Sequence, residues 1–349
     1  MVRSLYSFLV ISVLLFSCSG KDDAPDVSGI GVKLAVERFE QDFFAVDTNN
    51  LAASLKEVYQ KYPGFFPNFN TEILGLPPLN DTSFAAYNAI KQFLRDYRPI
   101  KDSVDKQFKN IGSIEEDVRK GLQYVKYYFP QYKAPQKLIT YIGPMDAIFT
   151  SRTGGIQSDV ISPDALTTGL QLHLGSGFSV YHSAMGQQLY PTYLSRRFTP
   201  EYIAVNCMKN IIDDIYVEDI SSKPLVEQMI EKGKRIYVLD KLMPHTPDTL
   251  KIGYTKRQLD GCYESEGKIW NFFLTNGFLL TKDPGLQQGY LSDAPSTPEF
   301  GEGSPGYIGL FVGWQIVKKF MEKNEQLSVQ DLLLTDSKKI FEESKYKPK

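Results

Sequence analysis

The stretch that decides the fold is residues 199–244, TPEYIAVNCMKNIIDDIYVEDISSKPLVEQMIEKGKRIYVLDKLMP. Apolar residues recur in it every three or four positions, first across residues 199–216 and again across residues 224–242. This spacing predicts two consecutive helices joined by a short polar break. Thr199 is expected to cap the first helix, with Pro200 in its first turn.

Glycines in the expected helices indicate where helices come close together. Gly233 falls inside the second helix of the stretch, where a glycine costs about 1 kcal/mol relative to alanine, so it is expected at a close approach of two backbones. Gly309 and Gly313 lie four residues apart in a further helix predicted over residues 306–324. They are expected to form a face of small residues for close helix packing.

A pair of helices of this kind resembles the core of zincin metallopeptidases. Those enzymes carry H-E-x-x-H on the first helix, which supplies two metal ligands one turn apart and a general base, and a Glu on a later helix as third ligand. Here the five positions are assigned to residues 200–204, PEYIA, so that Glu201 remains while Pro200 and Ala204 cannot bind a metal. The sequence therefore predicts a zincin-like core without a metal or cofactor.

Composition narrows the class of protein. The chain has 349 residues, is 42% hydrophobic and carries a formal charge of −2, which argues against a nucleic-acid-binding protein. Three cysteines are too few for a disulfide framework. Cys207 and Cys262 fall on apolar helix faces and are interpreted as buried free thiols, or as a disulfide if their helices adjoin.

The N-terminus predicts a lipid-anchored protein. Residues 1–17 have a positive charge at Arg3 and an apolar run too short to span a bilayer, which is typical of a signal peptide. The run ends in Leu-Phe-Ser-Cys, similar to a bacterial lipobox, so Cys18 is the expected site of lipidation. Residues 18–34 are expected to be a tether, in which Lys21-Asp22-Asp23 resembles an export signal for surface lipoproteins. The protein is expected at the periplasmic face of a membrane, with the cell surface as the alternative.

The rest of the chain predicts a mostly helical α+β fold. Strands are expected over residues 137–142 and 167–174, with a weaker one at 156–161, and a short strand leads into a helix within 32–44. Residues 35–349 should form a single compact domain, with a helical N-terminal layer over residues 35–135 and the zincin-like part over 136–349. The small central β-sheet should carry helices on both sides.

Further helices are expected on either side of the central stretch. They cover residues 51–62, 82–97, 113–129, 255–278 and 328–344. Ser113 and Glu116 have the spacing of a capping box, and Thr255 has the position of an N-cap.

Short motifs spread along the chain resemble the GldB family of gliding-motility lipoproteins of Bacteroidetes. These motifs are the lipobox, Glu37-Arg38-Phe39-Glu40, Tyr62-Pro63-Gly64-Phe65-Phe66, Leu172-His173-Leu174-Gly175, Tyr190-Pro191-Thr192-Tyr193-Leu194, Gly233-Lys234-Arg235-Ile236-Tyr237, Glu266-Gly267-Lys268-Ile269-Trp270, Pro305-Gly306-Tyr307-Ile308-Gly309 and Gly313-Trp314-Gln315-Ile316-Val317. The resemblance implies a membrane-anchored component needed for gliding, without an assigned catalytic activity. Its partners would then be other proteins of the gliding and secretion machinery.

Four residues are the candidates if the protein is an enzyme after all. They are Glu201, Glu266, His173 and His182. Each also has a simpler interpretation: a surface or loop position for the histidines, a carboxylate at a helix N-terminus for Glu201, and a structural salt bridge for Glu266, with Arg196, Arg197, Arg235 or Lys268 as its partner.

Three functions are therefore considered. The first is a non-catalytic envelope lipoprotein that holds a partner protein. The second is a metal-dependent hydrolase with an unusual site built from His173, His182 and Glu266. The third is a binder of carbohydrate or peptidoglycan through Tyr181, Tyr190 and Tyr193, which look exposed.

Overall fold

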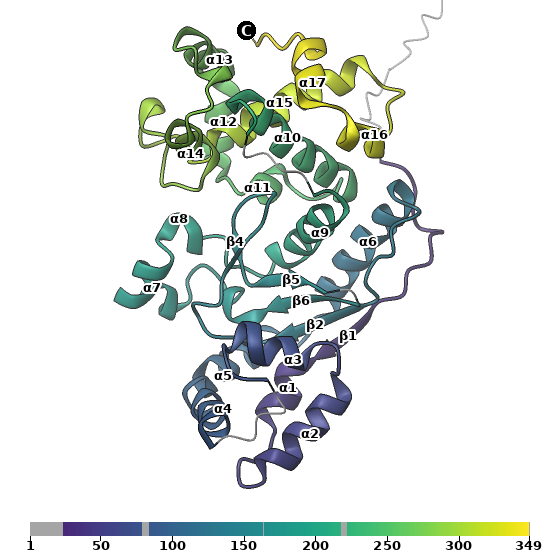
Figure 1. The fold of residues 1–349 in the computed structure, drawn as a ribbon, viewed down its shortest axis with the longest axis vertical. Helices are drawn as coiled ribbons and strands as arrows, with labels where there is room; N and C mark the ends of the chain where they lie inside the picture. The colour runs from purple at the N-terminus through teal and green to yellow at the C-terminus, as the bar shows by residue number, and fades with distance from the viewer. Residues whose placement is uncertain (1–23, 79–83, 163, 218–221, 349) are drawn as a thin grey trace, which may run out of the picture.

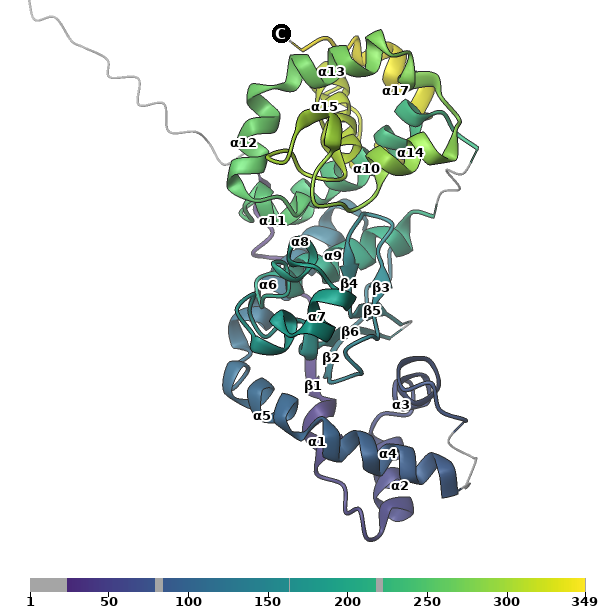
Figure 2. The ribbon, with the colours of Figure 1, turned by 90° about the vertical axis from the view of Figure 1, so that its left-hand side faces the viewer.

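The computed structural model describes residues 24–78, 84–162, 164–217 and 222–348, and in them the chain forms three tiers (Figures 1 and 2). A small sheet lies in the middle, with the helices of residues 39–107 on one side and the helix of residues 112–128 together with the C-terminal helices on the other. The expected α+β class, mostly helical with helices on both sides of the sheet, is confirmed. Cys18 and the signal-like segment lie outside the described residues.

The sheet has four strands in the order β1-β2-β6-β5. They are β1 (Ala35–Arg38), β2 (Lys137–Tyr141), β5 (Asp159–Ile161) and β6 (Ala165–Gly169). The first three strands in that order run parallel, and β5 is an antiparallel edge strand. Strands β3 (Phe149–Thr150) and β4 (Ile156–Gln157) form a separate hairpin. Helices cover both faces, which is why nearly every residue of β2 and β6 is buried.

The expected strand over residues 167–174 is wrong in its second half. Strand β6 ends at Gly169, and Leu170–Leu172 form a 3₁₀ turn. The prediction assumed that alternating polar residues face water, but Gln171 and His173 are buried. Gln171, for example, accepts a hydrogen bond from the backbone N–H of Gly143 at 3.0 Å. Buried polar side chains therefore produced the same alternating pattern in the sequence as a half-exposed strand.

The N-terminal helices enclose an aromatic core against the sheet. They are α1 (Phe39–Phe44), α2 (Leu51–Lys61), α3 (Phe66–Asn68), α4 (Phe84–Asp96) and α5 (Arg98–Gln107), with a π-helical turn at Phe69–Ile73. Helix α6 (Gly112–Tyr128) lies on the other side of the sheet (Figure 1). The ring of Phe39 lies 5.0 Å from that of Phe65 and 4.7 Å from that of Phe69, and Phe69 in turn lies 5.9 Å from Tyr141 of β2. The capping box predicted at Ser113 is wrong, because α6 begins one residue earlier without a side-chain cap.

Part of the expected tether packs against α6. The side chain of Gln123 donates a hydrogen bond to the carbonyl oxygen of Ile30 at 3.0 Å, and Arg119 donates to those of Val32 and Leu34, both at 3.1 Å. Val27 is buried. The chain is thus held against the body from about this residue onwards.

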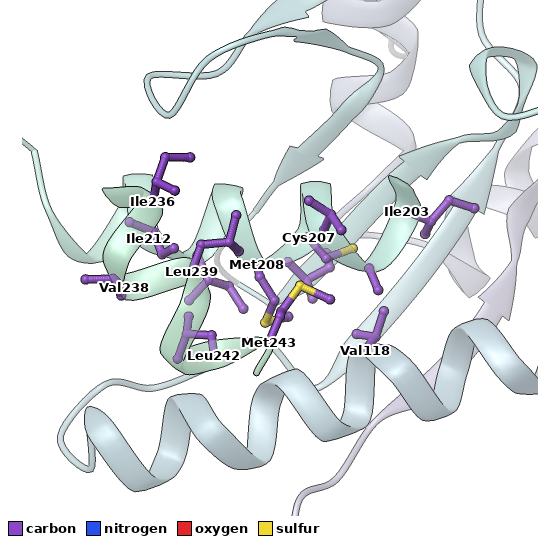
Figure 3. Packing of buried hydrophobic residues seen from close by; sticks show 14 of the residues in the cluster. Val118, Ile203, Cys207, Met208, Ile212, Ile236, Val238, Leu239, Leu242 and Met243 are labelled. Atoms are coloured by element: carbon purple, nitrogen blue, oxygen red, sulfur yellow. The ribbon is translucent and has the colours of Figure 1, made fainter. Parts of the chain in front are cut away.

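The two helices of the central stretch are confirmed as α9 (Tyr202–Ile215) and α10 (Leu225–Leu242), and they pack against each other. Figure 3 shows apolar side chains from both helices meeting Val118 of α6. The predicted start at Thr199 is wrong. Pro200 and Glu201 lie in a turn before α9, in which the N–H of Tyr202 bonds to the Thr199 carbonyl oxygen at 3.1 Å.

Helix α10 also crosses α15 (Ile308–Lys323) at the predicted glycines. A β-carbon built on Gly233 would lie 2.2 Å from the backbone carbon of Gly313, and one built on Gly313 would lie 1.7 Å from the backbone oxygen of Met229. No side chain fits between the two helices at this crossing, so both expectations of close packing are confirmed.

The remaining C-terminal helices in the described ranges are short, and α11 (Asp248–Ile252) and α14 (Pro284–Leu291) were not predicted. The others are α12 (Lys256–Glu264), α13 (Glu266–Thr275), α16 (Val329–Leu334) and α17 (Ser337–Ser344). The single helix expected over residues 255–278 breaks at Ser265, whose backbone leaves the helical region. Thr255 is confirmed as its N-cap, in a capping box with Gln258.

Candidate functional site

The four candidate residues do not form a common site. Glu201 is exposed in the turn before α9. His182, exposed in the 3₁₀ turn Ser179–His182, donates from Nε2 to the carbonyl oxygen of Ser176 at 2.8 Å. Glu266 accepts a hydrogen bond from the hydroxyl of Tyr346 at 2.5 Å, which is a different partner from the four basic residues expected. The hydrolase site proposed from His173, His182 and Glu266 is therefore not assembled.

His173 is buried and paired with an acid, so its expected position on the surface is wrong. Its Nδ1 donates to the carbonyl oxygen of Thr199 at 3.1 Å, and its Nε2 lies 3.0 Å from both carboxylate oxygens of Asp159. Burial alone would lower the pKa of His173, but the charge and hydrogen bond of Asp159 outweigh it and raise the pKa. With an acceptor at each ring nitrogen, the imidazole is held in its protonated form.

Asp159 is the centre of a buried polar cluster on the sheet side of α9. Its carboxylate also accepts from the side-chain amide of Asn206 at 2.6 Å and from the hydroxyl of Thr168. Its backbone oxygen accepts from the side-chain amide of Asn210 at 3.0 Å. Gln157 completes the cluster by donating to the side-chain oxygen of Asn210 at 2.5 Å. We call Gln157, Asp159, Thr168, His173, Asn206 and Asn210 the Asp159 cluster.

This cluster was not predicted from the sequence. Asn206 and Asn210 are one turn apart on α9, as the two ligands of a zincin motif would be, and that spacing was the available signal. The earlier assignment to Pro200 and Ala204 is wrong, because Pro200 and Glu201 precede the helix and cannot share a helical face with Ala204. Asn206 and Asn210 lie six residues after the two positions to which the motif was assigned.

A second cluster holds the loop between β3 and β4. The carboxylate of Asp213, on α9, accepts from the hydroxyl of Ser151, the backbone N–H of Arg152 and the hydroxyl of Thr153, each at 2.8 Å. Arg235 of α10 lies 3.5 Å from the same carboxylate. Helix α9 thus fixes both the edge strand and the neighbouring hairpin loop.

Other predictions about side chains are also corrected. Glu231, expected in solvent, is buried between Lys223 at 3.0 Å and Lys234 at 3.1 Å and accepts from the hydroxyl of Ser337. Tyr181 and Tyr190 are fully buried, which removes the basis for a carbohydrate-binding surface. Cys207 and Cys262 are buried free thiols, as expected.

The described residues hold neither a metal-binding group of side chains nor a helix suited to span a membrane. In the described ranges, no three or more His, Cys, Asp or Glu side chains are grouped so that they could hold a metal ion. None of the helices in those ranges has both the length and the apolar character needed to span a bilayer.

Comparison with known proteins places the chain in a family. No curated protein and no solved structure matches it. The family model described as gliding motility protein GldB matches residues 20–348, which includes every motif on which the resemblance rested except the lipobox. The chain therefore belongs to the GldB family of gliding-motility proteins.

Proposed function

We propose that this protein is a membrane-anchored lipoprotein of the cell envelope that serves gliding motility without catalysing a reaction. Family membership implies a role in gliding. The lipobox ending at Cys18 supports anchoring by lipid, and two or more acyl chains would hold the protein stably on a membrane. The protein acts there through contacts with other proteins of the gliding and secretion machinery.

The observation that carries the non-catalytic proposal is the closed state of the Asp159 cluster. Asp159 is fully buried, and its two carboxylate oxygens already accept from His173, Asn206 and Thr168. A general base must reach the proton it removes, and a metal ligand needs a free lone pair. The carboxylate of Asp159 accepts hydrogen bonds only from internal donors, so it can serve neither as a general base nor as a metal ligand. Its role is to stabilise the fold.

The same cluster supports descent from a zincin-like scaffold. In the revised register, Asn206 and Asn210 stand where the two histidines of H-E-x-x-H would stand, and Cys207 replaces the glutamate. The amides of both asparagines face Asp159, on the edge strand. On this proposal a polar structural cluster has replaced the metal centre, and the body has become a binding module.

Gliding assays with protein levels measured alongside test the proposal. Glu201→Gln, His182→Ala and Glu266→Gln each remove a group that a hydrolase would need, and each should leave gliding intact. Asp159→Asn serves as the comparison, because it should lower gliding only as far as it lowers the amount of folded protein. Loss of gliding in Glu201→Gln or His182→Ala at normal protein level would contradict the non-catalytic function.

A further inference from the structure

A small pocket opens beside the Asp159 cluster, between α9 and the loop that joins β3 to β4. Its walls include Gly154, Gly155, Arg197, Tyr202 and Lys209. The centres of water-sized atoms can occupy a volume of about 20 Å³ inside this pocket. One such atom needs on the order of 10–15 Å³, so the pocket has room for one or two of them.

Lys209 is the unusual group in this pocket. Its side chain is buried, and the one polar contact of its ammonium group with the described residues is the carbonyl oxygen of Gly154, at 3.5 Å. A buried ammonium normally has an ion pair or several hydrogen bonds, because removing it from water is costly. This one has a single long contact at the edge of a pocket.

The other charges of the pocket are already balanced. Arg197 is bound through both of its terminal nitrogens to Asp293, at 3.0 and 2.9 Å. His173 is paired with Asp159. Asp213 faces the loop, where Ser151, Arg152 and Thr153 occupy it. Among the described residues that line the pocket none is acidic, so Lys209 leaves a net positive charge there.

The glycine pair Gly154-Gly155 and the side chain of Tyr202 shape the pocket around the ammonium group of Lys209. Gly154 and Gly155 have φ of +109° and +93°, which other residues rarely adopt, and a β-carbon on Gly154 would collide with the ring of Tyr307 at 2.3 Å. Tyr202 lies on the same face of α9 as Lys209, seven residues earlier, and its hydroxyl makes no hydrogen bond to the part of the chain that the structure describes. An ammonium and a hydroxyl are thus both available as donors.

We propose that this pocket binds a carboxylate group, with Lys209 as its counter-ion and Tyr202 as a further donor. The two oxygens of a carboxylate can enter this space while the rest of the molecule stays outside the pocket, whereas the four oxygens of a phosphate would exceed it. The carboxylate is that of a small organic acid or the free C-terminus of a peptide. The inference is independent of the part that the protein plays in gliding.

Thermal unfolding of the purified full-length protein tests the proposal, because a ligand that binds only the folded state raises the unfolding midpoint. Sodium acetate, and a short peptide with a free C-terminus against the same peptide as its C-terminal amide, are compared with sodium chloride at equal ionic strength. The proposal expects a higher midpoint with acetate or with the peptide acid, and the two arms distinguish the source of the carboxylate. Phosphate should stabilise less.

The matched variants are Lys209→Met and Lys256→Met. Methionine keeps most of the lysine stem, and loss of a charge-assisted hydrogen bond should weaken carboxylate binding by roughly 10- to 100-fold. Lys256 is exposed on α12 and serves as the control, which should bind like the wild type. Equal stabilisation of wild type and Lys209→Met, no stabilisation by either carboxylate, or stronger stabilisation by phosphate would each overturn the proposal.

A measurement on the wild type alone keeps the test decisive if Lys209→Met does not fold. Burial, and then the charge of Arg197, lower the pKa of Lys209 to about 8, while Asp293 and Asp213 act in the opposite direction. Carboxylate binding should therefore weaken as pH rises through about 8. His173 also lines the pocket; burial lowers its pKa, but the charge and hydrogen bond of Asp159 raise it further. Carboxylate binding that stays constant across pH 8 would count against Lys209 as the counter-ion.

Discussion

Replacing Gly313 by alanine should force α10 and α15 apart. The new β-carbon would lie 1.7 Å from the backbone oxygen of Met229 and 2.3 Å from its carbonyl carbon. Both atoms belong to the backbone of α10, so no side chain can rotate to relieve the contact. The two helices must separate by more than an ångström, and the contacts along their crossing would be lost together.

The size of the effect follows from two opposing terms. Overpacking a well-packed interface costs about 1–3 kcal/mol or more, and a clash between two backbones belongs at the upper end of that range. Alanine recovers about 1 kcal/mol relative to glycine inside a helix. The net loss in the free energy of unfolding should be about 2 kcal/mol or more, which lowers the unfolding midpoint by about 3 °C or more for a chain of 349 residues.

Circular dichroism of the purified full-length protein during heating measures this effect. Gly261→Ala in α12 is the matched control, because a β-carbon there meets no atom within 4 Å and should keep or slightly raise the midpoint. Gly233→Val should be as damaging as Gly313→Ala, and the double variant should lose less than the sum, since both changes open the same crossing. An unchanged midpoint in Gly313→Ala would refute the close approach of the two helices.

Three further predictions concern buried charges and the anchor. His173→Gln should cost about 3–5 kcal/mol near neutral pH, because it leaves Asp159 buried without its partner. The pKa of His173 is raised on folding, so its contribution is complete below about pH 6.5 and is lost as pH rises through the folded pKa. Urea unfolding should show that pH dependence in the wild type only, and the same slope in His173→Gln would contradict it. Burial raises the pKa of Glu231, but Lys234, Ser337 and Lys223 lower it further than burial raises it. Glu231→Gln should therefore destabilise the protein by about 3 kcal/mol near neutral pH, and the difference from wild type should shrink in acid as Glu231 becomes protonated; a difference independent of pH would speak against the ion pairs. Cys18→Ser should abolish labelling by a fatty-acid analogue and sedimentation with membranes, whereas continued labelling would refute the lipobox.

Helices were predicted well where one apolar stripe sufficed. The residues of α9 from Tyr202 to Ile212 and most of α10 are buried, and their 3.6-residue period is unmistakable in the sequence. The glycine crossing followed from Gly233, Gly309 and Gly313, because a glycine in a helix interior needs a packing reason. Ends of helices were predicted less well. Ser265 carries no signal for a break, and the turn at Pro200 looks like a first helical turn.

The candidate site was missed because its polar residues pack against each other inside the protein. Asn206, Lys209, Asn210 and Asp213 form a polar stripe on α9, and such a stripe in a sequence predicts a face turned to solvent. Its partners come from segments 47 to 62 residues away, in β5 and the loop before β4, and no rule of local sequence spacing applies over such a separation. The hydrophobic pattern alone therefore gives no indication that this stripe is buried.

Once buried, the stripe has a consistent physical role. Asn206 and Asn210 fasten the antiparallel edge strand through Asp159, and Asp213 fastens the hairpin loop through Ser151 and Thr153. Each of these groups exchanges water for internal partners, so its burial costs little. Lys209, in the middle of the same stripe, has only one long contact. Three of the four polar side chains on this face of α9 have internal partners, and the charged fourth, Lys209, lies beside a pocket. This arrangement suits the binding of a ligand. The missing partner of Lys209 should be an anion.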